Sequence, residues 1–182
     1  IESLRMEQEG QFRNTGTTSW APFHAHQLLS NSGFVWDATI SLMPYAWSPT
    51  MQVCDAWAGG QATMKMALMR VIGLSSLHTT SDDEEENNTS MLLQGEALRW
   101  LAEAVLIPTV LRPEEGLVLW NKSERDDMAT LSLNPKAFKK LEAQLEVTFD
   151  AEDGFLVQVN GRRPFWNAPT SHEFLMKSWE GH

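Results

Sequence analysis

Two histidines have a spacing that would let both bind one metal ion. His24 and His26 lie two residues apart in FHAHQ, so on a strand both imidazoles lie on one face. A third ligand would have to come from elsewhere, and Asp37 or Asp55 are the candidates. The alternative is a pair of strand-face histidines without a ligand, and on this alternative we expect neither a metal nor another cofactor.

Asp37 and Asp55 are the candidates for acid–base catalysis. Each follows an apolar strand residue and lies near a tryptophan, Trp36 or Trp57. A carboxylic acid in apolar surroundings can act as a general acid, which makes a hydrolase one function that the sequence allows. The alternative is that each carboxylate bonds a neighbouring backbone amide at the end of a strand. No nucleophile elbow, P-loop or dinucleotide fingerprint supports catalysis.

A third charged group lies in GEALRWLAEAVLIPTVLRP, residues 95–113. Apolar residues at helical spacing, among them Trp100, predict a helix over about 90–107 that ends before Pro108. Glu96 and Arg99 are three residues apart, and Arg99 and Glu103 are four apart. This spacing predicts ion pairs along the surface edge of the helix.

Most of the remaining chain has the alternating pattern of strands. We expect strands at 4–12, 33–43, 50–60, 61–74, 117–121, 128–133, 143–150, 155–161 and from 172 onward. A helix is the alternative for 61–74, and 135–143 is either a helical turn or the start of a strand. Residues 75–90 read as a polar loop with five consecutive acids at 82–86, and Asp153-Gly154 marks a hairpin turn.

This order of elements predicts the α+β class, mostly β. We expect a strongly curved antiparallel sheet, a half-barrel, with the one main helix at about 90–107 against its concave side, in a single domain over 1–182. If the concave face holds a hydrophobic ligand, its walls and polar floor would comprise Trp36, Asp37, Asp55, Trp57, Arg99, Trp100 and Glu103.

Composition limits the partners. The net charge of −10 argues against nucleic acid and favours a protein partner with a basic surface. The longest apolar run, residues 104–111, is too short to span a bilayer, for which about 20 residues are needed. The single cysteine, Cys54, allows no internal disulfide.

The eight tryptophans exceed what one core needs. Five of them lie in loop-like contexts: Trp20, Trp47, Trp120, Trp166 and Trp179. They either anchor a partner or close the ends of the half-barrel as core. Trp166 is the best candidate anchor, because Arg162 and Arg163 precede it and arginine beside tryptophan is frequent at binding hot spots. Trp179 is a second candidate.

The sequence resembles a family of uncharacterised proteins that is known from bacteria and also found in algae. WAPFHAHQ, GFVWDATISLMP, CDAWAGGQATMKMALM, GEALRWLAEAVLIPTVL and SWEG carry the resemblance in this order. It implies no reaction or ligand. The acidic run at 82–86 looks like an insertion relative to the family, and the chain is expected to be shorter than its relatives at the C-terminus. The half-barrel is similar to that of periplasmic lipoprotein carriers by analogy of fold alone.

We therefore expect a non-enzymatic accessory subunit that docks on a larger protein assembly. The occurrence of the family in algae suggests a plastid location, at the periphery of a photosynthetic membrane complex. The alternative is a carrier of a hydrophobic small molecule or lipid, and the second alternative is the hydrolase with Asp37 and Asp55.

Overall fold

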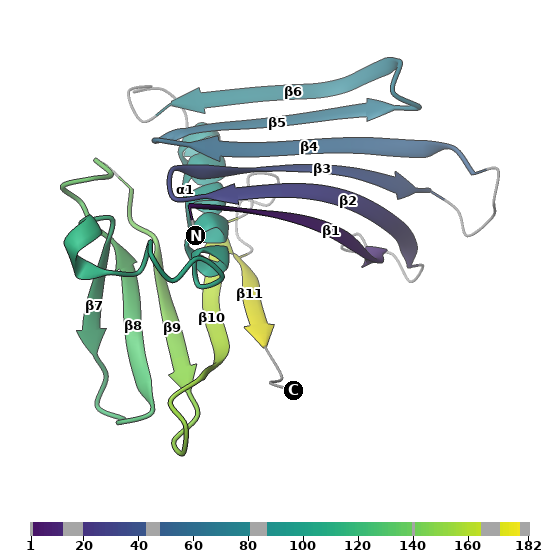
Figure 1. The fold of residues 1–182 in the computed structure, drawn as a ribbon. Helices are drawn as coiled ribbons and strands as arrows, with labels where there is room; N and C mark the ends of the chain where they lie inside the picture. The colour runs from purple at the N-terminus through teal and green to yellow at the C-terminus, as the bar shows by residue number, and fades with distance from the viewer. Residues whose placement is uncertain are drawn as a thin grey trace.

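The computed structural model consists of two antiparallel sheets and a main helix (Figure 1). It describes residues 2–12, 20–42, 48–80, 87–139, 141–164 and 172–178. The six-stranded sheet follows sequence order: β1 (Ser3–Phe12), β2 (Ala21–Ser30), β3 (Gly33–Ser41), β4 (Thr50–Ala58), β5 (Gln61–Leu68) and β6 (Ile72–Thr80). The five-stranded sheet has the order β11–β10–β9–β8–β7, with β7 (Val118–Lys122), β8 (Met128–Leu133), β9 (Gln144–Phe149), β10 (Leu156–Pro164) and β11 (His172–Ser178). The mostly-β class with a curved antiparallel sheet is confirmed, although the strands form two sheets instead of one.

Helix α1 (Asn87–Ala104) packs against strands of both sheets (Figure 1). It begins and ends about three residues before the predicted 90–107. After Ala104 the chain continues in tighter turns, in which the amide of Ile107 donates to the carbonyl of Ala104 at 2.8 Å. A short 3-10 helix, η1 (Pro113–Glu115), then leads into β7. No helix in the described ranges is long and apolar enough to cross a membrane.

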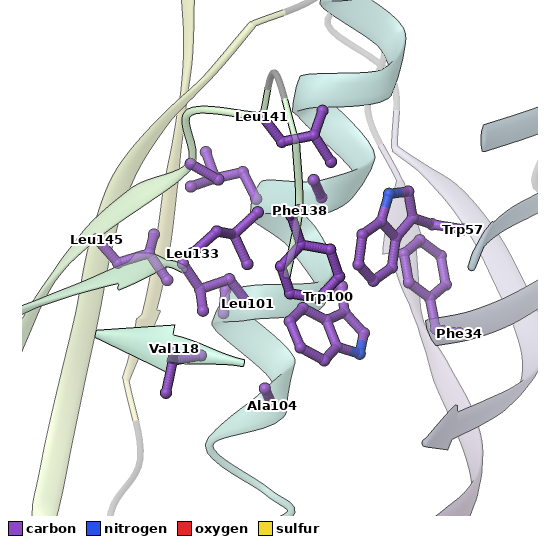
Figure 2. Close-up of a cluster of buried hydrophobic side chains, with 14 of the residues drawn as sticks. Phe34, Trp57, Trp100, Leu101, Ala104, Val118, Leu133, Phe138, Leu141 and Leu145 are labelled. Carbon is purple, nitrogen blue, oxygen red and sulfur yellow. The ribbon is translucent and has the colours of Figure 1, made fainter. Parts of the chain in front are cut away.

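The main core lies where α1 meets the two sheets (Figure 2). Trp57 of β4, Trp100 of α1 and Phe138 form a triangle with ring centroids 4.9, 5.5 and 5.7 Å apart. Phe138 comes from the segment between β8 and β9, which forms turns and not a strand. The indole nitrogen of Trp100 donates to the carbonyl of Ser30 at 3.0 Å, so the buried ring leaves no polar atom unbonded. Side chains of both sheets and the helix thus share one hydrophobic cluster.

The strand predicted over 61–74 is a hairpin, β5–β6, and residues 75–80 belong to β6 instead of a polar loop. Met69 and Arg70 turn the chain with φ angles of 52° and 62°. The amide of Val71 then donates to the carbonyl of Leu68 at 3.1 Å. Two consecutive residues at positive φ are typical of a two-residue hairpin turn that favours Asn-Gly. Met-Arg gives no such signal, which is why the prediction was wrong.

The register of β2 to β5 arranges the inner face, the face toward α1, in four rows across the strands. From α1 outward the rows are Leu29, Phe34, Trp57, Ala62; Gln27, Trp36, Asp55, Met64; Ala25, Ala38, Val53, Met66; and Phe23, Ile40, Met51, Leu68. The first row joins the main core. The third and fourth rows supply a second, separate cluster that includes Ala25, Ala38, Ile40 and Val53.

Candidate functional site

A buried charged cluster connects α1 to the second row of the inner face. The Arg99 guanidinium contacts two carboxylates: its Nη1 lies 3.2 Å from Oδ2 of Asp55, and its Nε lies 3.5 Å from Oε1 of Glu103. The same guanidinium lies over the rings of Phe34 and Trp36, at 4.7 and 4.8 Å from their centroids. Arg99 is therefore held by charge on one side and by aromatic faces on the other.

Amide side chains extend this cluster to the edge strand β1. Gln27 donates to Oε2 of Glu103, and Gln8 donates to Oε1 of Gln27 at 2.6 Å. The indole of Trp36 donates to Oε1 of Gln8 at 2.9 Å. The network thus links α1 with β1, β2, β3 and β4. Gln27 shares the parity of the apolar Ala25 and Leu29, a signal in the sequence that it faces inward.

The prediction that the helix charges pair along the surface is wrong. The side chains of Arg99, Asp55 and Glu103 are only 11%, 7% and 5% exposed, and Glu96 is buried as well. The reason is that sheets cover α1 on more than one side, so the edge of the helix opposite its apolar stripe also lies under strands. Helical periodicity predicts which residues share a face and does not predict how many layers cover the helix.

The cluster has the groups of an acid–base site but is filled by its own contacts. Two carboxylates share one guanidinium, and the Gln27 amide supplies a further donor to Glu103. Open depressions on the six-stranded sheet lie next to His26 and next to His24, and neither is lined by Asp55, Arg99 or Glu103. The arrangement fixes α1 on the sheet, and Gln27 of the same network borders the depression beside His26.

Asp37 and Asp55 lie on opposite faces of the six-stranded sheet. Asp55 faces α1, whereas Asp37 is exposed on the outer face and accepts a 2.6 Å hydrogen bond from Gln52. His24 and His26 share that outer face, with ring centroids 4.9 Å apart. In the described part of the chain no three His, Cys, Asp or Glu residues gather where a metal could bind. Asp37 therefore has no place in a polar floor with Asp55, Arg99 and Glu103.

The predicted ligand walls divide between the main core and the edge of the second cluster. Trp57 and Trp100 are 1% and 0% exposed and pack on each other, so they belong to the core. Trp36 is half-buried and contacts Phe23 with ring centroids 6.1 Å apart. Of the wall residues predicted from the sequence, Trp36 alone borders the second cluster.

The structure places some of the predicted partner anchors. Arg162 and Arg163 lie in β10, paired with β11, and not in a loop; Arg162 is exposed. Trp166 and Trp179 lie outside the described residues, as does Trp47. Trp120 is not a loop residue, since it lies in β7 and its indole donates to the carbonyl of Leu111 at 2.9 Å. Trp20 is 51% exposed.

An apolar surface that the sequence analysis missed lies at the β5–β6 hairpin. Met69, Val71, Ile72 and Leu74 are 59%, 85%, 56% and 55% exposed. They follow one another closely around the turn, at the end of the sheet away from α1 (Figure 1). We call these four residues the hairpin patch. The sequence signal for this surface is the apolar run VIGL after Met-Arg, which the strand prediction over 61–74 places inside one long strand.

A family model described as "Family of unknown function (DUF6920)" matches residues 1–182. No curated protein matches the chain. No solved structure matches it either.

Proposed function

The chain belongs to this family of unknown function, and we propose that it is a non-enzymatic interaction protein that docks on a partner protein through the hairpin patch. The observation that carries the proposal is the exposure of its four large apolar side chains, between 55% and 85%. Neighbouring exposed apolar residues are typical of interaction sites, whereas single ones are ordinary on any surface.

The backbone of the hairpin supports the same proposal. Met69 and Arg70 both adopt the left-handed conformation, which disfavours residues with a side chain by about 1–2 kcal/mol each. Asn-Gly would relieve this strain. Strain that a simple substitution could remove is often found at functional segments.

A non-catalytic role is supported by the placement of the candidate acids. Asp37 and Asp55 face opposite sides of the sheet, and Asp55 is bonded to Arg99 beneath α1. The net charge of −10 supports a partner with a basic surface, because complementary charge raises the association rate and selects the partner.

A double substitution in the hairpin patch tests the proposal. Val71→Ser with Leu74→Ser removes exposed apolar surface, and Leu28→Ser with Val35→Ser is the matched control on the outer face, where these residues are 40% and 43% exposed. Partners are cross-linked in the native cells and quantified by mass spectrometry. We expect the hairpin variant, with unchanged circular dichroism, to lose partners that the control keeps. Equal recovery by both variants would contradict the proposal.

The second candidate function is that of a carrier for a hydrophobic small molecule or lipid. The second cluster favours it, since Phe23, Trp36, Met51 and Met66 are only partly buried around it. Methionine side chains adapt to varied apolar shapes. Native mass spectrometry of protein purified from its source tests this candidate, and retained lipid would support it. Loss of that lipid in a variant with Met51→Ala and Met66→Ala would mean that the lipid binds at the third and fourth rows.

A further inference from the structure

The last strand of the six-stranded sheet, β6, has an open outer side. No other strand in the described part of the chain pairs there, because the sheet order ends at β6. The unpaired amides and carbonyls of such an edge are a template for another strand. The nine residues of β6, IGLSSLHTT, include no Asp, Glu, Lys, Arg or Pro, which are the residues that usually protect edges.

The opposite edge strand of the same sheet, β1, is protected. Arg5, Glu7 and Glu9 alternate along it and are exposed on its outer face. An added strand would have to bury or accommodate these charges. The sheet therefore has one edge that discourages strand addition and one that permits it.

The geometry of β6 has two parts. Residues 75–80 pair regularly with residues 61–66 of β5, so the strand has a regular backbone there that a partner strand could extend. The pairing then shifts by one residue, which leaves Leu74 without a counterpart on β5. Val71, Ile72 and Leu74 form an apolar surface at this end, with exposures above one half.

We propose that β6 receives an extended segment of a partner protein that pairs with residues 75–80 through main-chain hydrogen bonds. Its apolar side chains would contact the hairpin patch, and it would carry Lys or Arg. This rests on the proposed function and specifies its mode of binding. The positive charge follows from the net charge of −10, which favours a partner segment of opposite charge. A second copy of this chain fits less well, because it would bring two charges of −10 together.

Selection from a displayed library of random 12-residue peptides tests this proposal. The bait is the whole chain, and binders are compared on Leu74→Lys and on the matched control Leu28→Lys, which adds the same charge to an exposed site on an interior strand. Leu74 has no β5 counterpart, so the substitution leaves the β5–β6 ladder intact. We expect selected peptides to alternate apolar and polar residues, to be rich in Lys or Arg, and to bind Leu74→Lys at least about ten-fold more weakly than the control.

Backbone chemistry separates strand addition from other docking. N-methylation of alternate amides in a selected peptide should weaken binding by about ten-fold or more, because it removes main-chain donors. Hydrogen exchange of residues 75–80 should slow in the complex. Peptides that tolerate N-methylation, or that protect another region, would overturn strand addition while leaving docking through the hairpin patch in place. A dimer of the unliganded chain with protected β6 amides would also overturn it, in favour of a second copy.

Discussion

The two ends of the six-stranded sheet carry similar apolar side chains in opposite surroundings. At the end under α1, Leu29, Phe34 and Trp57 are at most 3% exposed, whereas at the β5–β6 hairpin Val71 is 85% exposed. The difference lies in what covers the sheet: helix α1 and Phe138 of the β8–β9 segment at one end, and none of the described elements at the hairpin patch. The covered end therefore accounts for stability, and the uncovered end is where binding is expected.

The largest effect is expected at the covered end. Trp100→Ala should lower the free energy of unfolding by about 3–5 kcal/mol, because it leaves a void between Trp57 and Phe138. Urea unfolding followed by circular dichroism measures this. Trp20→Ala is the control at a 51% exposed site, with an expected change below about 1 kcal/mol. Similar losses for both variants would show that α1 is not the centre of the core.

The charged cluster should be nearly as sensitive. Arg99→Met leaves the buried carboxylates of Asp55 and Glu103 without their guanidinium, and the expected loss is about 3 kcal/mol. Arg112→Met, at an exposed site, is the control and should change stability little. An Arg99→Met variant that unfolds at the same urea concentration as the parent would refute the burial of this cluster.

Substitutions in the β5–β6 turn, at the uncovered end, should raise stability instead of lowering it. Met69→Asn with Arg70→Gly places residues that favour positive φ at both positions. The free energy of unfolding should rise by about 1–2 kcal/mol, less than the strain of both residues together, because glycine loses more conformational freedom on folding. Thermal and urea unfolding measure the gain. Unchanged or lower stability would mean that the strain in this turn is not real. Partner recovery should persist, since Val71, Ile72 and Leu74 are kept.

Local signals predicted some of these features and not others. The hairpin at Asp153-Gly154 and the existence of α1 followed from strong turn and periodicity signals, and Gly154 does adopt a positive φ of 72°. The β5–β6 turn could not be predicted from local signals, because Met-Arg has no intrinsic preference for the conformation that it adopts. Only the tertiary pairing of β5 with β6 imposes it.

For the site residues too, local patterns predict some features and tertiary contacts decide the others. The sequence-based prediction places Asp37 and Asp55 in one polar floor. Strand parity could have separated them, because Asp55 shares the face of Val53 and Trp57, whereas Asp37 shares the face of the exposed Val35. The burial of Arg99 could not be predicted in this way, because it depends on contacts with β3 and β4, which are distant in sequence. Exposure of the hairpin patch likewise depends on where α1 lies, at the end of the strands opposite the β5–β6 turn (Figure 1).

The smallest effect is expected for the reactivity of the Cys54 thiol, on the outer face of the six-stranded sheet. Burial raises the pKa of the Cys54 thiol, and the negative charges of Asp37 and Asp55 raise it further. Asp37→Asn removes one of these charges, so the pKa should fall and the reactive thiolate fraction at pH 8 should rise. Alkylation by iodoacetamide, followed by mass spectrometry, should then be faster than in the parent. Asp153→Asn, at the distant β9–β10 turn, is the control; a rate equal to the control would contradict the proximity of Asp37 to Cys54.

Amide hydrogen exchange tests partner binding at the hairpin patch most directly. The protein is isolated from its source, and exchange along β2 to β6 is compared between the free protein and the proposed complex. We expect residues 69–80 to gain protection in the complex, while the already buried strands beneath α1 change little. Unchanged exchange at 69–80 would contradict the account. Protection confined to the rows around Phe23 and Met51 would also contradict it and would favour the carrier.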